Sequence, residues 1–201
     1  MTRHGWLGAL GLLLVVAGLL SVGHGLWIEA KAVLAQVLLD RAWTQARANG
    51  AAVKPWPWAD TWPVARIEAP RIGARAVVLS GVGGEALAFG PGHMAGTPPP
   101  GGPGTSIIAG HRDTHFRFLQ ELRVGDELIV EIAGGRTVRF VVVETGVVDA
   151  RASGLDPDGP PRLALVTCWP FDAVAPGGAE RYVVLAEPRP TVGLDPAPSP
   201  V

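Results

Sequence analysis

The longest uninterrupted apolar run lies near the start of the chain, over residues 6–28. It reads WLGALGLLLVVAGLLSVGHGLWI, carries no formal charge, and has only Ser21 and His24 as polar positions. At about 1.5 Å per residue, a helix of this length crosses a hydrocarbon core of about 30 Å. The pattern predicts a tail and transmembrane anchor over residues 1–28, with a cleaved signal peptide ending near Ala30–Ala32 as the competing interpretation.

Charges on the two sides of this run do not settle its orientation. Arg3 precedes it, whereas Lys31, Arg41 and Arg47 follow it. Because long domains translocate largely regardless of flanking charge, the simplest arrangement leaves the short tail inside the cell. We therefore expect a single-pass protein of the inner cell membrane, with its main domain facing the periplasm or the exterior.

A second pattern, over residues 29–48, spaces its apolar positions three and four residues apart, as an amphipathic helix does. Asn49–Gly50 is a typical helix stop. Residues 54–63, KPWPWADTWP, disfavour helix and favour extended structure. Residues 29–63 are therefore expected to form a helical stalk and a linker whose tryptophans pack against the domain or the membrane interface, rather than an exposed recognition strip.

Between residues 64 and 188 the hydrophobic pattern changes to short β-type runs separated by glycine and proline. These runs are VARIEAPRIG, ARAVVLSG, TSIIAGH, DELIVEI, RTVRFVVVETGVVD, RLALVTC and RYVVLAE. Residues 126–132 and 136–142 form a predicted hairpin, and no stretch here has a long helical period. The pattern predicts a mainly β domain over 64–188, a compact antiparallel or mixed barrel of about seven or eight strands, with 189–201 as a flexible tail.

Composition argues against some classes of function but does not identify one. The net charge is −1, so nothing points to nucleic acid as a partner. The 27 glycines and 19 prolines favour a turn-rich β protein over a helical bundle.

The candidate chemistry begins with Cys168, the only cysteine of the chain. It closes the apolar run Leu163–Thr167 and precedes Trp169–Pro170, so a strand delivers one thiol to its end. A lone cysteine cannot form an internal disulfide. Because a free thiol outside the cytoplasm is exposed to oxidation, its presence there suggests a functional role. Taken alone, it is equally consistent with a nucleophile and with a buried structural cysteine.

Histidine is the usual partner of a thiol nucleophile, and His111 ends another apolar run, TSIIAGH. His115 lies four residues further on and is its rival. The two histidines also invite a metal site, but no third ligand stands at a recognised spacing and there is no HExxH pattern, so no metal is expected. Asp113 and His115 are candidates for orienting or capping groups in a tight turn.

Arg181 opens the last strong strand run, RYVVL. An acyl transfer to a thiol passes through an oxyanion, which needs a donor where the negative charge develops. Arginine serves this role without losing its proton. By itself Arg181 would be a surface arginine flanking a strand.

The ordered segments IIAGHRDTHF, LVTCWPF and ERYVVLAEP after an N-terminal anchor resemble the sortase family of cysteine transpeptidases, and more closely its Gram-negative, proteobacterial branch. The family's TLxTC-type motif is similar to residues 164–168, with Ala164 where threonine is usual. The resemblance implies Cys168 as nucleophile, His111 as acid and base, and Arg181 as the oxyanion and substrate group. Thr167, which precedes the thiol in that motif, is taken with His115 and Asp113 as a supporting residue.

The resemblance further implies an eight-stranded sortase barrel without a cofactor. Its expected partners are a secreted protein with an LPxTG-type C-terminal sorting signal and an amine acceptor that the sequence does not identify. Three alternatives stay open: an L,D-transpeptidase, although Pro170 stands where that class carries arginine; a cysteine peptidase without an acceptor; and a membrane-tethered β-barrel binding module with a buried Cys168.

Overall fold

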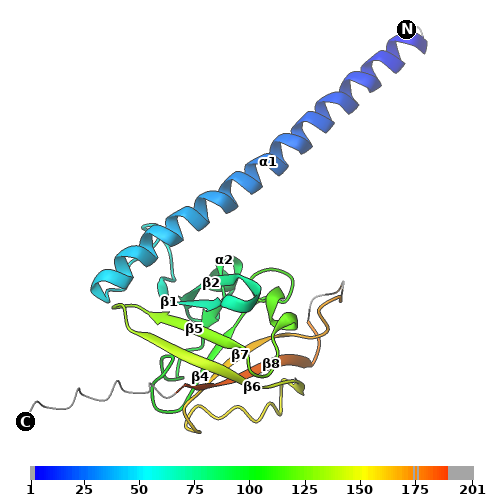
Figure 1. The fold of residues 1–201 in the computed structure, drawn as a ribbon. Helices are drawn as coiled ribbons and strands as arrows, with labels where there is room; N and C mark the ends of the chain where they lie inside the picture. The colour runs from blue at the N-terminus through cyan, green and yellow to red at the C-terminus, as the bar shows by residue number, and fades with distance from the viewer. Residues whose placement is uncertain (1–2, 174, 176, 190–201) are drawn as a thin grey trace, which may run out of the picture. The chain divides into compact units, whose positions relative to one another are not determined.

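The computed structural model describes residues 3–173, 175 and 177–189, so residues 190–201 of the predicted tail lie outside the described part. The chain divides into two compact units between Leu38 and Leu39 (Figure 1). A single helix, α1 (Arg3–Asn49), supplies the first unit and continues into the second.

The first unit consists of the apolar part of α1. Its large hydrophobic side chains are exposed, among them Leu13, Leu20 and Leu26. The hydroxyl of Ser21 donates to the carbonyl of Ala17 at 2.8 Å, so this polar group is satisfied within the helix. Within the described residues, one helix is long and apolar enough to cross a membrane, the stretch Leu10–Asn49 of α1.

In the second unit, the last turns of α1 pack on the β domain. Leu39, Trp43 and Ala46 are buried at spacings of four and three residues, which places them on one face of the helix. The helix ends at Asn49 because Gly50 adopts φ of +70° and its N–H donates to the carbonyl of Ala46 at 2.8 Å.

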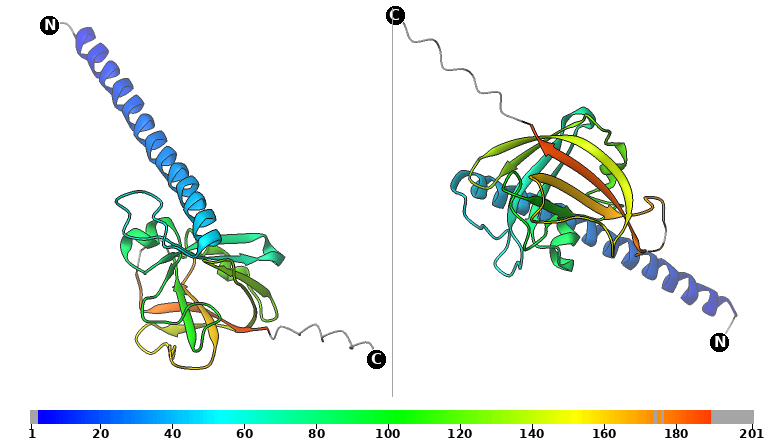
Figure 2. Two further views of the ribbon diagram at one scale, coloured as in Figure 1. Left: turned by 90° about the vertical axis from the view of Figure 1, so that its left-hand side faces the viewer. Right: turned by 90° about the horizontal axis from the view of Figure 1, so that it is seen from below.

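Eight strands form a closed barrel, which confirms the predicted fold class. They are β1 (Pro63–Ala69), β2 (Ala74–Ser80), β3 (Gly92–His93), β4 (Thr105–Ala109), β5 (Glu127–Ile132), β6 (Thr137–Asp149), β7 (Arg162–Cys168) and β8 (Glu180–Pro188). Their order around the barrel is β1-β2-β3-β4-β7-β8-β6-β5, and β1 also pairs with β5. The right-hand view of Figure 2 looks onto β8 between β6 and β7.

The barrel is mixed rather than purely antiparallel. β2 pairs in parallel with β3, and β4 pairs in parallel with β7, while the remaining pairs are antiparallel. The predicted hairpin is present as β5 and β6. Because β4 and β7 run in the same direction, both deliver the residues after them to the same end of the barrel.

Three short helical segments connect these strands: η1 (Pro70–Ile72), α2 (Gly84–Phe89) and η2 (Arg117–Glu121). They are too short to leave a helical period in the sequence. The interior is apolar, and its largest fully buried side chains include Phe116, Phe140 and Leu165.

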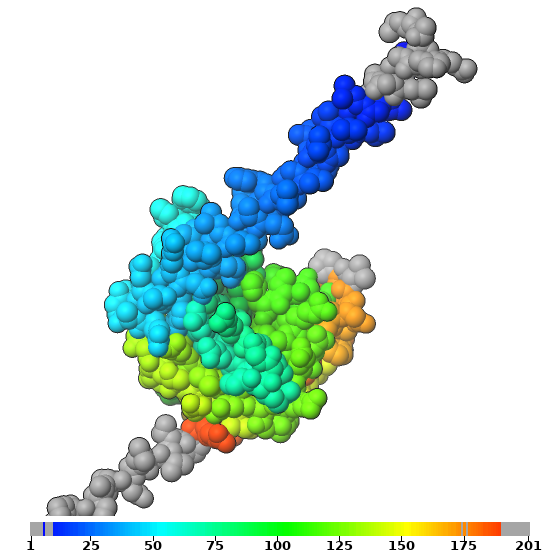
Figure 3. Space-filling model, turned by 45° about the horizontal axis from the view of Figure 1, so that its top comes forward, coloured from blue at the N-terminus to red at the C-terminus, as the bar shows by residue number. Residues whose placement is uncertain are grey.

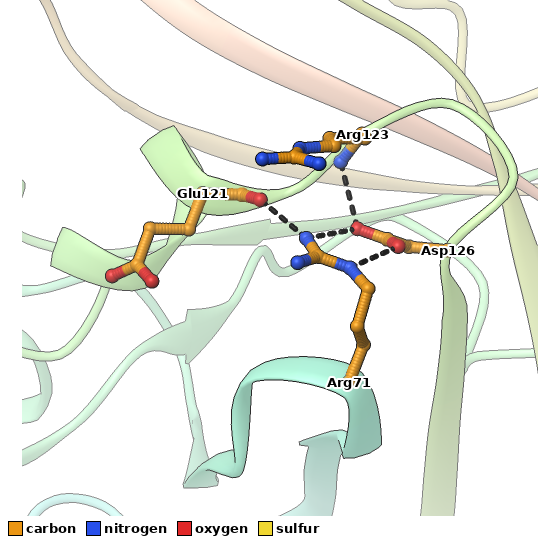
Figure 4. Close-up of polar contacts among 4 residues, drawn as sticks. All are labelled: Arg71, Glu121, Arg123 and Asp126. Atoms are coloured by element: carbon orange, nitrogen blue, oxygen red, sulfur yellow. Dashed lines mark hydrogen bonds and ion pairs between the residues drawn. The ribbon is translucent and has the colours of Figure 1, made fainter.

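A cluster of polar side chains stabilises the segment that precedes β5 (Figure 4). Both carboxylate oxygens of Asp126 accept from Arg71 of η1, at 2.5 and 2.7 Å. The same arginine donates to the carbonyl of Glu121, and the backbone N–H of Arg123 donates to Asp126 at 2.8 Å. The hydrogen bonds from Arg71 hold the pKa of Asp126 below its usual range.

Candidate active site

His111 follows β4 after one residue, Gly110. The N–H of Gly110 donates to the carbonyl of Val166 at 3.0 Å, which continues the β4–β7 pairing past the end of β4. A Cβ at position 110 would lie 2.8 Å from the ring of the buried Phe116, so only glycine fits there. The chain therefore leaves β4 over the Phe116 ring, with His111 exposed on the surface.

The three residues proposed to act together lie at one end of the barrel, where β4 and β7 end and β8 begins, and they are called the row below. In the parallel β4–β7 pair Ala109 opposes Val166, so β4 leads to His111, two residues further on, at the same end of the barrel at which β7 ends in Cys168. In the antiparallel β7–β8 pair Cys168 directly opposes Arg181. Opposed residues project to the same face, with Cα atoms about 4.5–5.5 Å apart. The row thus joins the ends of β4 and β7 to the beginning of β8.

Cys168 lies on the outer face of the barrel. Along β7, Leu163 and Leu165 belong to the central core, and side chains alternate between the two faces. Thr167 therefore continues the inner set, whereas Cys168 projects outward. Cys168 is a free, half-buried thiol, so it is neither sealed in the core nor fully exposed.

Thr167 links the end of β7 to the end of β4 from the inner face of the barrel. It is 2% exposed, and its hydroxyl donates to the carbonyl of Gly110 at 2.7 Å. This hydrogen bond joins the residue before Cys168 to the residue before His111. It fixes the spacing between the two strand ends that carry the thiol and the imidazole.

Arg181 is half-buried, and hydrogen bonds to nearby backbone carbonyls orient its guanidinium. Its Nη1 donates to the carbonyls of Gly178 and Glu180, each at 2.8 Å. Gly178 belongs to the connection between β7 and β8, of which the structure describes residues 169–173, 175 and 177–179, and these residues are called the β7–β8 loop below. The direction of the guanidinium therefore depends on where the end of this loop lies.

The structure places the other two candidates in the turn after β4. Asp113 is exposed in that turn. His115 is half-buried, and burial lowers the pKa of its imidazole, with the nearby positive charge of His111 lowering it further and the carbonyl of Ala88 opposing the shift. The two histidines are thus neighbours, and His111 is the one that lies closer along the chain to the end of β4.

Sequence reasoning missed Arg112, the residue directly after His111. It is 7% exposed, and its Nη2 donates to the carbonyls of Ala173 and Ala175 at 3.0 and 2.6 Å. The turn after β4 and the η2 segment lie beside the β7–β8 loop on the surface (Figure 3). No sequence signal distinguishes this arginine from a surface charge, because its burial depends on a loop about sixty residues away.

A pocket of about 590 Å³ is lined by residues that follow β7 and by Tyr182 of β8. Its wall includes Trp169, Phe171 and Tyr182, together with Arg117 of η2. The Trp169 and Tyr182 rings stack with centroids 5.7 Å apart, and Phe171 meets Tyr182 edge-on at 5.2 Å. This aromatic cluster braces the first part of the β7–β8 loop against β8.

The described residues contain no group of three or more histidine, cysteine, aspartate or glutamate side chains that would hold a metal ion. His111 and His115 approach each other without a third ligand in that part of the chain. The arrangement instead combines a thiol, an imidazole and a guanidinium, which is suited to acyl transfer through a covalent intermediate.

Comparison with known proteins identifies the family of the β domain. Residues 67–189 match the family model of the Sortase domain. Sortase D of Bacillus subtilis (strain 168) is 31% identical over 120 residues, which cover 59% of this chain and 60% of that relative. The chain thus spans less than two thirds of the length of that relative.

Solved structures show the same fold. Sortase A from Corynebacterium diphtheriae superposes with a TM-score of 0.56 at 28% identity, covering 70% of this chain and 65% of that one. A Clostridium perfringens Sortase D5 transpeptidase gives a TM-score of 0.61 at 22% identity, covering 78% of this chain and 99% of that one. The last likeness is one of fold alone. Since the family model covers more than half of the chain, the protein belongs to the sortase family.

Proposed function

We propose that the protein is a membrane-anchored cysteine transpeptidase that cleaves an LPxTG-type sorting signal near the C-terminus of secreted proteins and transfers the acyl group to an amine. The observation that carries this proposal is that Cys168 directly opposes Arg181 in the β7–β8 pair, while β4, which runs parallel to β7, leads to His111 at the same end of the barrel. A nucleophile, a proton carrier and a fixed cation on one face are the groups that acyl transfer requires.

In the first step the Cys168 thiolate attacks the carbonyl carbon of the scissile peptide bond. The carbonyl oxygen becomes an oxyanion, which Arg181 stabilises through donors not used by its two bonds to the loop. When the tetrahedral intermediate collapses, the C–N bond breaks and the imidazolium of His111 gives its proton to the leaving amine. The product is a thioester on Cys168 and a released C-terminal fragment.

In the second step an incoming amine attacks the thioester carbonyl. Neutral His111 accepts the proton that the amine loses, and the C–S bond breaks to return the thiolate. The acyl group leaves on the new amide, so the enzyme is unchanged over the cycle. Water in place of the amine gives hydrolysis, and neither route needs a cofactor.

The length and apolar character of the first part of α1 support a single-pass anchor in the inner cell membrane. The catalytic domain then faces the periplasm or the exterior, where secreted substrates are found. Membership of the Gram-negative branch of the family stays a prediction from the three sequence segments that carry the resemblance.

The test of this function is to incubate the full-length protein in detergent with an LPxTG-type peptide and a library of primary amines. Mass spectrometry then identifies the products. Transpeptidation predicts ligated peptide whose amount rises with amine concentration. If only hydrolysed peptide formed at high amine concentration, the protein would be a cysteine peptidase instead.

Single substitutions assign the two histidines. His111→Ala is expected to abolish turnover, whereas His115→Ala is expected to keep most of it, because His111 lies two residues after the end of β4 beside β7, while His115 lies in the turn that comes after it. The opposite result would transfer the acid and base role to His115. A non-catalytic binding module is distinguished by thiol labelling, since a buried structural cysteine resists iodoacetamide in the folded protein while a nucleophile reacts.

A further inference from the structure

Arg112 connects two parts of the site that are distant in sequence. Its backbone follows His111, and its buried guanidinium binds the carbonyls of Ala173 and Ala175 in the β7–β8 loop. That loop begins directly after Cys168 and ends just before β8, which carries Arg181. One side chain therefore reaches from the segment after β4 to the segment between the thiol and the catalytic guanidinium.

Stability alone does not account for this side chain. Nη1 of Arg112 is buried and finds no hydrogen-bond partner, and no carboxylate pairs with the guanidinium in the described part of the chain. Arginine cannot escape the cost of burial by losing its proton. An apolar side chain of similar shape would avoid this cost, so the arginine is better explained by what it does to the loop.

The loop in turn orients Arg181. Nη1 of Arg181 is held by the carbonyl of Gly178 at the end of the loop and by that of Glu180. Arg112 holds Ala173 and Ala175, which lie only a few residues before Gly178. A displacement of the middle of the loop would therefore move the carbonyl that directs Arg181, while Cys168 stays fixed by strand pairing.

We propose that Arg112 is a positioning residue that clamps the β7–β8 loop and thereby aims Arg181 at the oxyanion formed on the Cys168 substrate. This inference rests on the proposed function, because it gives Arg112 a role through Arg181. It assigns Arg112 no contact with the reacting atoms.

The experiment compares the full-length wild-type protein with Arg112→Met and Arg112→Lys in detergent micelles. Arg75→Met, which removes an exposed arginine from β2, is the matched control. We expect Arg112→Met to lower kcat for peptide cleavage by about tenfold or more, with a smaller change in KM, because the clamp acts on transition-state stabilisation. Its melting temperature should equal or exceed that of the wild type, and Arg112→Lys should retain intermediate activity.

Hydrogen exchange, measured by mass spectrometry, tests whether Arg112 restrains the β7–β8 loop. This measurement does not depend on turnover. The amides of residues 169, 171–173 and 177–179 should exchange faster in Arg112→Met, since Pro170 has no amide hydrogen. Adding guanidinium ions to Arg112→Ala should slow that exchange and raise kcat. The proposal is overturned by wild-type loop exchange in Arg112→Met, or by a loss of kcat that follows a lower melting temperature. If Arg112→Met does not fold, the proposal is tested instead by the activity and loop exchange of Arg112→Lys and by the rescue of Arg112→Ala with guanidinium ions. If the wild type itself cleaves no peptide, the proposed function fails while the exchange data still test the clamp.

Discussion

Thr167 and Cys168 are consecutive residues with opposite tasks, because side chains alternate along β7. Cys168 projects outward into the row, whereas the hydroxyl of Thr167 joins the ends of β7 and β4 through the carbonyl of Gly110. We expect Thr167→Val to lower the free energy of unfolding by about 1 kcal/mol, since it leaves a buried carbonyl without its donor. The same change should lower kcat several-fold, because the thiol and the imidazole are no longer held at one spacing.

Thr167→Ser is the matched control, since it keeps the hydroxyl and removes only a methyl group. Urea denaturation and steady-state kinetics check both variants. Equal kcat values for the valine and serine variants would show that the hydrogen bond does not position the site.

His115 makes the stability of the domain depend on pH. Its pKa is lowered by burial and by the charge of His111, so the unfolded chain binds a proton more readily than the folded protein does. The stability that neutral His115 contributes is therefore present above the unfolded pKa of about 6.5 and is lost as pH falls through the lower folded pKa. We expect His115→Gln to lose less stability than the wild type between about pH 7.5 and 5.

Urea midpoints across this pH range measure the effect. Because the two proteins differ only at position 115, the difference between their two pH curves reports His115. Parallel curves would contradict the assigned direction of the shift.

At the scale of elements, the last turns of α1 are expected to contribute strongly to the stability of the second unit. Trp43 is 1% exposed, and the guanidinium of Arg66 lies 5.6 Å from the centroid of its ring. Trp43→Ala should lower the free energy of unfolding by about 3–5 kcal/mol, as for other buried tryptophans. Trp58, which is 78% exposed in the linker, is the matched control, and Trp58→Ala should change stability by less than about 0.5 kcal/mol. Similar losses for both variants would refute the packing of this helix end on the β domain.

The elements also show what the sequence could predict. The runs that form β5, β6 and β7 are evident in the sequence as short β-type runs separated by glycine and proline. β3 has only two residues, so it leaves no periodic pattern to detect. β4 ends two residues before the predicted run does, because Gly110 turns over the ring of Phe116, and that packing exists only in the folded barrel.

At the scale of the whole molecule, the order of strands decides the site. Cys168, His111 and Arg181 were each predicted from their positions at strand ends, but no pattern states that β4 and β7 are parallel neighbours or sets their register. Those facts arise from barrel closure, in which long-range pairing places distant segments side by side. The burial of Arg112 was unpredictable for the same reason, since its partners lie across the barrel surface in the β7–β8 loop.

The central claim is that Cys168 forms a thioester with the acyl part of a sorting-signal peptide. The most direct measurement is the intact mass of the full-length protein after brief exposure to an LPxTG-type peptide, followed by acid quench and peptide mapping. The account predicts an added mass equal to the acyl fragment, located on Cys168, which disappears on treatment with hydroxylamine and is absent in Cys168→Ala. Turnover of the peptide by Cys168→Ala, or an adduct on any other residue, would contradict it.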